Sequence, residues 1–174
     1  MRILIACEFS GRVRDAFAAR GFEAWSCDLL PSETPGHHIQ DDVLGIISKG
    51  WDLIVAHPPC TYLANSGVRW LYGGKGKNID PVRWQSMESA CQFFNLMVDA
   101  SCPRVCVENP IMHGHANRRI AHAHTQIIQP WQHGDGATKA TCLWLRNLPM
   151  LQPSRVVSGR AAECHREGPG PQRQ

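Results

Sequence analysis

The sequence lacks any apolar stretch long enough to cross a membrane as a helix. Such a helix needs about 18 or more apolar residues in a row, and none of that length occurs among the 174 residues. The first nine residues, MRILIACEF, reach an acid after a short apolar run, so they do not have the pattern of a secretion signal. We therefore expect a cytoplasmic protein whose chain starts with a buried strand.

Cysteine spacings typical of disulfide frameworks or zinc sites are also missing. The eight cysteines are scattered and lie mostly inside apolar runs, which favours free thiols. Neither Cys-x-x-Cys nor His-Glu-x-x-His occurs, and we predict no metal site. The histidines at 113, 115, 122, 124 and 133 are interpreted as surface residues near nucleic acid.

A large excess of charge of one sign is absent as well. The formal net charge is only +3, so no global basic field announces nucleic-acid binding, and any such contact needs local patches. With 43% hydrophobic and 19% charged residues, the composition is that of an ordinary globular protein. The length suits one domain with a sizeable core.

Short apolar runs alternate with amphipathic segments along the first 145 residues. They predict strands at 2–7, 23–27, 51–56, 104–107 and 141–145. They predict helices at 12–20, 43–49, 80–100 and in part of 111–130, with loops at 29–40 and 61–79. This order indicates an α/β fold: a single-domain, open, largely parallel sheet with helices on both faces. We assign residues 1–153 to this domain and 154–174 to a disordered tail rich in Arg, Gly and Pro.

Two residues with catalytic chemistry follow predicted strands, at the edge where such sheets bind ligands. Cys60 comes directly after Pro58 and Pro59, which stiffen the backbone, and a thiol on a rigid turn is suited to act as a nucleophile. Glu108 follows another strand and suits acid–base chemistry. Taken alone, each has an ordinary alternative: Cys60 as a buried structural cysteine, and Glu108 as a surface residue capping a turn.

These motifs resemble those of the DNA (cytosine-5) methyltransferases. The family's Gly-Gly-Pro-Pro-Cys-Gln is similar to residues 56–61, Ala-His-Pro-Pro-Cys-Thr, and its Glu-Asn-Val is similar to residues 108–110, Glu-Asn-Pro. Further similarities are Asp52-Leu53 before the nucleophile, an acid ending the second strand, and Asp41-Asp42-Val43 for Gly-Asp-Ile. The order agrees over residues 2 to about 145, and the chain looks like a short phage-type member. The resemblance implies a Rossmann-like class I methyltransferase in a bacterial or phage-infected cell.

The resemblance also implies a mechanism. Cys60 adds to C6 of cytosine, while protonated Glu108 hydrogen-bonds N3 and stabilises the developing charge. C5 then takes a methyl group, and loss of the C5 proton and of Cys60 restores the ring. Asn109, by resemblance, orders the active-site loop. In duplex DNA the base must leave the stack, which costs about a few kcal/mol.

S-adenosyl-L-methionine is the cofactor that the resemblance implies. The backbone of the first loop would face its methionine part, and Asp28 would accept hydrogen bonds from the ribose hydroxyls. Asp42 would lie near the adenine amino group, although it equally suits a solvated turn. The implied cofactor contacts are Glu8, Phe9, Ser10, Gly11, Asp28, Leu29, Asp42, Val43 and Pro58.

The chain departs from the family pattern in several places. Its first loop keeps one glycine, and the second arginine of the family's Gln-x-Arg-x-Arg motif is replaced by Thr141, with Lys139 at the first. At 174 residues we expect no separate target-recognition domain. Reading of the DNA sequence would then be weak, be done by loops, or be supplied by a partner chain or a second copy. The candidate nucleic-acid contacts are Ser66, Arg69, Lys75, Lys77, Arg118, Lys139 and Thr141.

Three other functions stay open at this point. The segment His57-Pro58-Pro59-Cys60 is a distant match to the Asp/Asn/Ser-Pro-Pro-aromatic motif of methyltransferases that act on exocyclic amines. A methyltransferase acting on a free nucleotide is a second alternative, since no recognition domain is visible. The third is a catalytically inactive, methyltransferase-like protein that binds nucleic acid, which the altered glycine loop favours and the retention of Cys60 and Glu108 disfavours.

Overall fold

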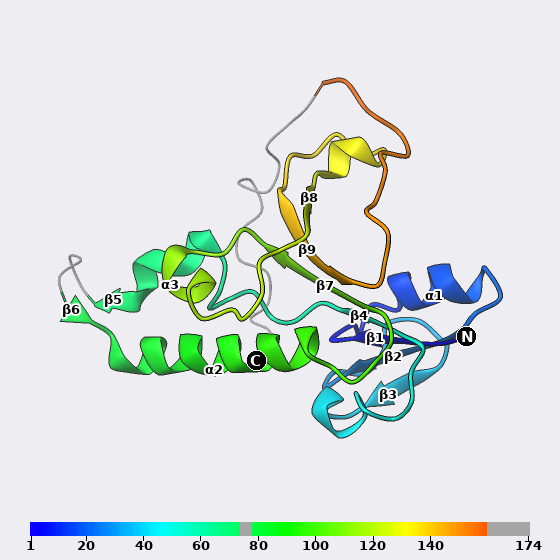
Figure 1. Cartoon of the computed structure of the whole chain (residues 1–174), viewed down its shortest axis with the longest axis horizontal. Coiled ribbons are helices and arrows are strands. Elements are labelled where there is room, and N and C mark those ends of the chain that lie inside the picture. Colours follow the sequence, from blue (N-terminus) through cyan, green and yellow to red (C-terminus); the bar gives the residue numbers. More distant parts are fainter. Residues whose placement is uncertain (74–77, 160–174) are drawn as a thin grey trace.

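A seven-stranded sheet forms the centre of the protein in the computed structural model, which describes residues 1–73 and 78–159 (Figure 1). Its strands are β1 (Arg2–Ala6), β2 (Glu23–Asp28), β3 (His38–Gln40), β4 (Leu53–Ala56), β7 (Val105–Pro110), β8 (Gln126–Ile128) and β9 (Thr141–Arg146). A second, two-stranded sheet pairs β5 (Tyr72–Gly73) with β6 (Asn78–Ile79). The helices are α1 (Arg12–Ala18), α2 (Pro81–Val98) and α3 (Gly114–Asn117), with 3-10 turns η1 (Val43–Gly45), η2 (Asn65–Leu71) and η3 (Pro130–Gln132).

The strand order is β3-β2-β1-β4-β7-β9-β8. From β3 to β7 every neighbouring pair is parallel, whereas β9 runs antiparallel to both β7 and β8. The first five strands in this list therefore have the 3-2-1-4-5 order of doubly wound sheets, which places a topological switch point between β1 and β4. The predicted α/β class and the largely parallel sheet are confirmed.

Helices cover the two faces of this sheet. Residues alternate between the faces of β1, so Ile3 and Ile5 pack in one cluster and Leu4 in the other. Val13 and Phe17 of α1 close the first cluster. On the other face lies α2, the long helix in Figure 1, and its side chains form much of the larger cluster. Helices on both faces explain why the central parallel strands β1 and β4 are almost wholly apolar.

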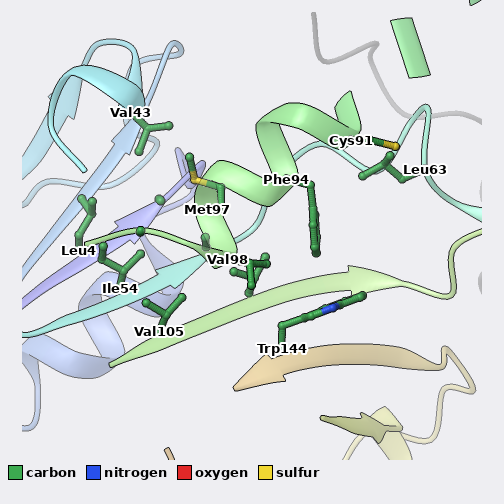
Figure 2. Packing of buried hydrophobic residues seen from close by; sticks show 14 of the residues in the cluster. Leu4, Val43, Ile54, Leu63, Cys91, Phe94, Met97, Val98, Val105 and Trp144 are labelled. Carbon is green, nitrogen blue, oxygen red and sulfur yellow. The ribbon is translucent and has the colours of Figure 1, made fainter. Parts of the chain in front are cut away.

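The helix α2 begins as its sequence predicts. The Asp80 carboxylate accepts the Arg83 amide hydrogen at 3.0 Å, and Pro81 occupies the first helical position, where no amide hydrogen is needed. Figure 2 shows Phe94, Met97 and Val98 of α2 pointing into the core, and the Phe94 ring meets Trp144 of β9 edge to face, with centroids 4.8 Å apart. The helix thereby ties the antiparallel end of the sheet to its parallel part.

Four segments differ from the sequence-based expectation. The helix expected at 43–49 is only a 3-10 turn, η1, over Val43–Gly45. The expected loop at 29–40 ends in β3, and the region 111–130 contains β8; each strand has only three residues, too few to show a periodic pattern. The expected loop at 61–79 contains η2, β5 and β6, and it is anchored because Leu63 and Leu71 are buried in the core.

The tail predicted for residues 154–174 begins within the part of the chain that the structure describes. The backbone amides of Arg155 and Val157 donate hydrogen bonds to the carbonyl oxygens of Gln132 and Trp131, at 3.1 and 2.9 Å. Residues 154–159 therefore pack beside η3. The rest of the predicted tail, residues 160–174, lies outside the described residues. None of the helices within residues 1–73 and 78–159 is long and apolar enough to span a membrane.

Candidate functional site

The candidate site lies along the carboxyl edge of the parallel strands. Cys7 and Glu8 follow β1, Asp28 ends β2, and Cys60 lies a short turn beyond β4. Glu108 lies near the end of β7. Because β4 and β7 are parallel and Ala56 pairs with Val107, their carboxyl ends come side by side. The fold therefore brings Cys60 and Glu108, 48 positions apart in the sequence, to neighbouring strand ends.

A tight turn holds Cys60. Its carbonyl oxygen accepts the amide hydrogens of Leu63 and Ala64, at 3.0 and 2.8 Å. Leu63 is fully buried, so the turn is pinned to the core directly after the cysteine. The Cys60 side chain is half-buried, neither sealed in the core nor fully in water. Such a position leaves the thiol accessible while limiting the backbone movement that would displace it.

The neighbour of Glu108 is a residue that sequence reasoning did not single out. His57 follows β4, and its Nδ1 lies 3.3 Å from Oε2 of Glu108. Both side chains are 28% exposed, so the pair faces a partly solvated edge. The Nε2 atom of His57 is buried without a hydrogen-bond partner within the described ranges. The only signal in the sequence is that a histidine replaces the second glycine of the family motif.

Asn109 joins β7 to the proline turn. Its side-chain Nδ2 donates a hydrogen bond to the carbonyl oxygen of Pro58 at 3.1 Å, and the residue is wholly buried. This contact spans two strand ends and fixes the backbone two residues before Cys60. Asn109 therefore holds the turn, whereas Glu108 beside it points to the exposed side.

Several other cysteines are poor nucleophiles because of their surroundings. Burial raises the pKa of the Cys7 thiol to about 12, with a further contribution from the carboxylates of Asp28 and Asp42. Burial likewise raises the pKa of Cys27, Cys91 and Cys106 to about 11. Thiolate is the reactive form, so these four thiols are almost entirely unreactive near neutral pH.

An acidic and apolar cluster lies at the ends of β1 and β2. Asp28 is half-buried, and its Oδ1 accepts the amide hydrogen of Leu30 at 3.0 Å. Leu29, the next residue, exposes 64% of its surface although it is apolar. Asp42 is exposed, and its side chain caps η1 by accepting the Leu44 amide hydrogen. Val43 is 5% exposed and belongs to the core, so little of it is open to a ligand.

The first turn after β1 is closed from within. The Glu8 carboxylate is buried and accepts the amide hydrogens of Val13 at 2.6 Å and Arg14 at 3.2 Å, so it caps the start of α1. Ser10 also donates its hydroxyl hydrogen to Glu8, at 3.2 Å. The backbone carbonyl oxygen of Phe9 accepts the Glu33 amide hydrogen. The Glu8 carboxylate is thus occupied by hydrogen bonds to the start of α1. A ligand at this turn would be contacted by backbone groups instead.

Gly11 is covered by a loop that a buried arginine organises. Gly11 has φ +74°, and a Cβ there would overlap the Thr34 hydroxyl and lie 2.5 Å from Nη2 of Arg14. Arg14 is 1% exposed and donates hydrogen bonds to Ser26, Ser32, Thr34 and the Pro35 carbonyl. Sequence reasoning missed Arg14, because an arginine inside a helix is ordinarily read as a surface residue.

The candidate nucleic-acid contacts separate into two groups. Ser66 and Arg69 are exposed on η2, and the Arg69 guanidinium lies 4.6 Å above the ring of Trp70, which is 55% exposed. Arg118 is exposed beside α3 and approaches the His115 ring. A hydrogen bond of 2.9 Å between the Tyr72 hydroxyl and His115 links these two segments.

The second group lies at the start of β9. Thr141 is the first residue of β9 and pairs with Pro110, so it lies at the end of β7 that carries Glu108. The Thr141 hydroxyl donates a hydrogen bond to the Lys139 carbonyl oxygen. Lys139 itself is exposed. Lys75 and Lys77, which were also predicted, lie outside the described residues.

The histidines do not form one surface group. His113 is 2% exposed: its Nδ1 accepts the Ala116 amide hydrogen at 3.1 Å, and its Nε2 contacts the Tyr62 carbonyl oxygen at 3.0 Å. The surface interpretation is therefore wrong for His113, because α3 and the loop after Cys60 enclose it. Among the residues that the structure describes, no cluster of three or more potential metal ligands occurs.

Comparison with known proteins supports the fold. No model of a protein family matches the chain, and no curated protein matches it. Among solved structures, the chain is similar to one described as a DNA modification methyltransferase encoded within a prophage of E. coli. The TM-score is 0.54 at 13% sequence identity, over 92% of this chain and 53% of the other. The protein thus spans about half the length of that structure and shares its α/β fold.

Proposed function

We propose that this protein methylates C5 of cytosine in DNA, with S-adenosyl-L-methionine as the methyl donor. One observation carries the proposal: adjacent parallel strands bring a carboxyl group, Glu108, to the edge from which the Cys60 turn emerges. A nucleophilic thiol and an acid beside it are the two groups that C5 chemistry needs, because an unactivated C5 does not take an electrophile.

The chain's own residues would act in sequence. The Cys60 thiolate forms a bond to C6, and the electron pair of the C5–C6 double bond moves into the ring. Glu108 donates its proton to N3 and so neutralises the charge that develops there. The activated C5 takes the methyl group. Solvent water at this partly exposed edge takes the C5 proton. The electron pair of the C5–H bond re-forms the C5–C6 double bond and expels the Cys60 thiolate, N3 returns its proton to Glu108, and the ring is restored.

Asn109 would contribute without touching the base. Its hydrogen bond to the Pro58 carbonyl keeps the turn fixed, so that the sulfur of Cys60 stays near attack distance. Small displacements of a nucleophile reduce rates steeply, because reacting atoms must approach within about 3–3.5 Å in the correct direction.

The residues at the ends of β1 and β2 fit a nucleoside cofactor. Asp28 offers a carboxylate oxygen for ribose hydroxyls, and the exposed apolar side chain of Leu29 offers a surface for the adenine ring. Backbone groups of Cys7 to Ser10, together with Asp42, would complete the site. We leave Gly11, Val43 and Pro58 out of direct contact, because all three are buried within the protein. S-adenosyl-L-methionine, when bound, supplies an electrophilic methyl group.

DNA would approach over the η2–α3 surface, which we define as Ser66, Arg69, Trp70 and Arg118, and over Lys139. Exposed guanidinium and ammonium groups bind phosphates, and an exposed tryptophan stacks on unpaired bases. An exposed stacking surface suits a base that has left the helix, and it also suits single-stranded DNA.

Methylation of an exocyclic amine is the second candidate, and His57 favours it. Amine methyltransferases use a polar side chain directly before the two prolines, and this chain has a polar imidazole at that position, beside Glu108. The presence of a thiol in place of an aromatic ring at Cys60 favours C5 chemistry instead. The two candidates give different products.

The first experiment uses an oligonucleotide with 5-fluorocytosine and tritiated S-adenosylmethionine. Fluorine at C5 blocks the last elimination, so a C5 enzyme stays attached to the DNA and carries the label. We expect a labelled adduct on a denaturing gel that disappears in Cys60→Ala and persists in Cys106→Ala, a half-buried control thiol. Mass spectrometry of nucleosides from unmodified DNA should find 5-methylcytosine.

Other outcomes point to the alternatives. Methylation at N4 of cytosine or N6 of adenine, retained in Cys60→Ala, would establish the amine candidate. Methylation of dCMP but not of an oligonucleotide would identify a nucleotide enzyme. Binding of DNA or cofactor by folded protein, with no methyl transfer to any substrate, would leave the binding-only function.

A further inference from the structure

The His57–Glu108 pair is built into the sheet itself. His57 follows Ala56, the last residue of β4, and Glu108 follows Val107 on β7, and these two predecessors pair in the parallel register. The imidazole and the carboxyl group therefore meet without loop rearrangement, at 3.3 Å between Nδ1 and Oε2. Both side chains keep 28% of their surface exposed, which leaves room for a base on the open side.

The surroundings of the second ring nitrogen favour one form of His57. Nε2 is buried and has no hydrogen-bond partner in the part of the chain that the structure describes. An imidazolium would carry a buried, unpaired N–H at Nε2, which costs more than an unpaired acceptor. The neutral ring with its proton on Nδ1 avoids this cost and donates that proton's hydrogen bond to Glu108.

We propose that His57 is a positioning residue for Glu108: its neutral Nδ1–H orients the carboxyl group and stabilises the carboxylate that remains when Glu108 gives its proton to N3. This inference rests on the proposed function. The proton given to N3 leaves Oε1, Oε2 keeps the hydrogen bond from Nδ1, and the imidazole neither gains nor loses a proton. A hydrogen bond to a charged group is stronger than one to a neutral group, so the His57 contact strengthens as the transition state forms.

Other titratable groups near Glu108 do not compete for this role. Cys106 on β7 and Cys142 on β9 are both influenced by the Glu108 charge, but burial raises the pKa of each thiol, so they stay protonated and neutral. The Cys60 thiolate is the nucleophile, and in the proposed reaction it is bonded to C6 of cytosine. Within the described residues His57 is the side chain that contacts the Glu108 carboxyl group by a hydrogen bond.

The test compares three replacements of His57. His57→Asn keeps a neutral amide donor near the position of Nδ1, His57→Gln moves the donor to the position of Nε2, and His57→Leu removes it. We expect the single-turnover rate constant of adduct formation to fall about 10- to 100-fold in the Leu and Gln variants. A loss of this size is typical when a hydrogen bond to a charged group is removed. The Asn variant should keep most of the rate. KM for DNA should stay near the wild-type value in all three.

A matched control removes another His–carboxylate pair. His122 contacts Asp99 at 2.8 Å on the exposed surface, and both lie near the end of α2, at the other edge of the sheet. His122→Leu should leave the rate unchanged. Equal rates in the wild type and all His57 variants, or equal loss in the Asn and Leu variants with normal unfolding temperatures, would overturn the role of His57. No adduct in the wild-type protein would instead overturn the proposed function.

Discussion

The Asn109 side chain donates a hydrogen bond to the Pro58 carbonyl across the gap between β7 and the turn after β4. The distance is 3.1 Å, and no part of Asn109 is exposed to solvent. Pro58 and Pro59 both lack an amide hydrogen, so this stretch of backbone offers carbonyl acceptors and no donors of its own. The side-chain amide of Asn109 therefore supplies the hydrogen-bond donor that the Pro58 carbonyl oxygen accepts.

Replacing Asn109 should impair methyl transfer more than binding. In Asn109→Ala the Pro58 carbonyl loses its partner and the Cys60 turn loses its tie to β7. We expect kcat to fall at least about tenfold, with KM for DNA nearly unchanged, because the loss concerns the position of the nucleophile. The protein should also lose about 1–2 kcal/mol of unfolding free energy, since a buried hydrogen bond is removed.

The control for Asn109 is Asn95 on α2, whose amide also bridges segments by binding Arg119 and Ala121. Asn95→Ala should cost a similar unfolding free energy while kcat stays near wild type. A variant of Asn109 with full activity would show that the Cys60 turn is held by other contacts.

Gly11 and Gly21 form a natural pair for separating backbone strain from steric overlap. Both have positive φ, +74° and +82°, but a Cβ at Gly21 would meet nothing within 4 Å. Gly21→Ala should therefore cost about 1 kcal/mol of unfolding free energy through strain alone. Gly11→Ala adds overlap with Thr34 and the buried Arg14, and we expect a loss larger by about 1–3 kcal/mol in urea unfolding. Equal losses would mean that the 32–36 loop moves aside freely.

The longer strands, and the strand ends near which Cys60 and Glu108 lie, could be predicted from the sequence because their signals are local. The runs around Ile3 to Ala6, Leu53 to Ala56 and Val105 to Val107 are apolar on both faces, which is typical of a parallel sheet covered by helices. Each run ends at a residue with chemistry. β3 and β8 could not be found in this way, because each consists of three residues held by pairing with a longer strand.

The contacts between the site residues could not be predicted from the sequence, because they form only when strands that are distant in the chain become neighbours in the sheet. Nothing near His57 in the chain indicates a carboxylate, and the contact exists only because β4 and β7 are neighbours. The same applies to Arg14: apart from the adjacent Asp15, its hydrogen-bond partners lie 12 to 21 residues further along the chain, on β2 and in the loop that follows it. The histidine at 113 likewise became a core residue through packing against Tyr62.

Thiol reactivity should single out Cys60. A thiol with a pKa near 11 is about a hundredfold less ionised at pH 8 than an ordinary cysteine, which applies to Cys27, Cys91 and Cys106. Limited treatment of the native protein with iodoacetamide, followed by peptide mass mapping, should modify Cys60 first. Cys164, outside the described residues, is replaced by Ser in the test protein. First modification of any other cysteine would contradict this assignment.

Asp28 should determine cofactor affinity. Its carboxylate follows β2 beside the exposed Leu29, and loss of hydrogen bonds to two ribose hydroxyls should weaken binding about 10- to 100-fold. Calorimetric titration of Asp28→Ala with S-adenosylhomocysteine measures this loss. Asp99→Ala, at the far end of α2, should bind like the wild type. Unchanged affinity in Asp28→Ala would move the cofactor away from the end of β2.

Stability should decline in mild acid because of His113. Burial lowers the pKa of this imidazole below its ordinary 6.5, and nearby positive groups, His115 and Arg119, act in the same direction. Below pH 6.5 His113 therefore binds a proton in the unfolded chain but not in the folded protein. The contribution of neutral His113 to the free energy of unfolding is complete above that pH and is lost as the pH falls. The loss from one such group cannot exceed about 1.4 kcal/mol per pH unit.

The variant His113→Asn isolates this effect. Asparagine can still accept the Ala116 amide hydrogen at the start of α3, as a good N-cap residue, but it does not titrate. At pH 8 the variant should be less stable than the wild type, because it loses the contact with the Tyr62 carbonyl. Urea unfolding at pH 8, 6.5 and 5.5 should show the difference between the two proteins shrinking as the pH falls, since all other histidines titrate alike in both. A constant difference would mean that the pKa of His113 is the same in the folded and the unfolded protein, and that another group causes any acid sensitivity.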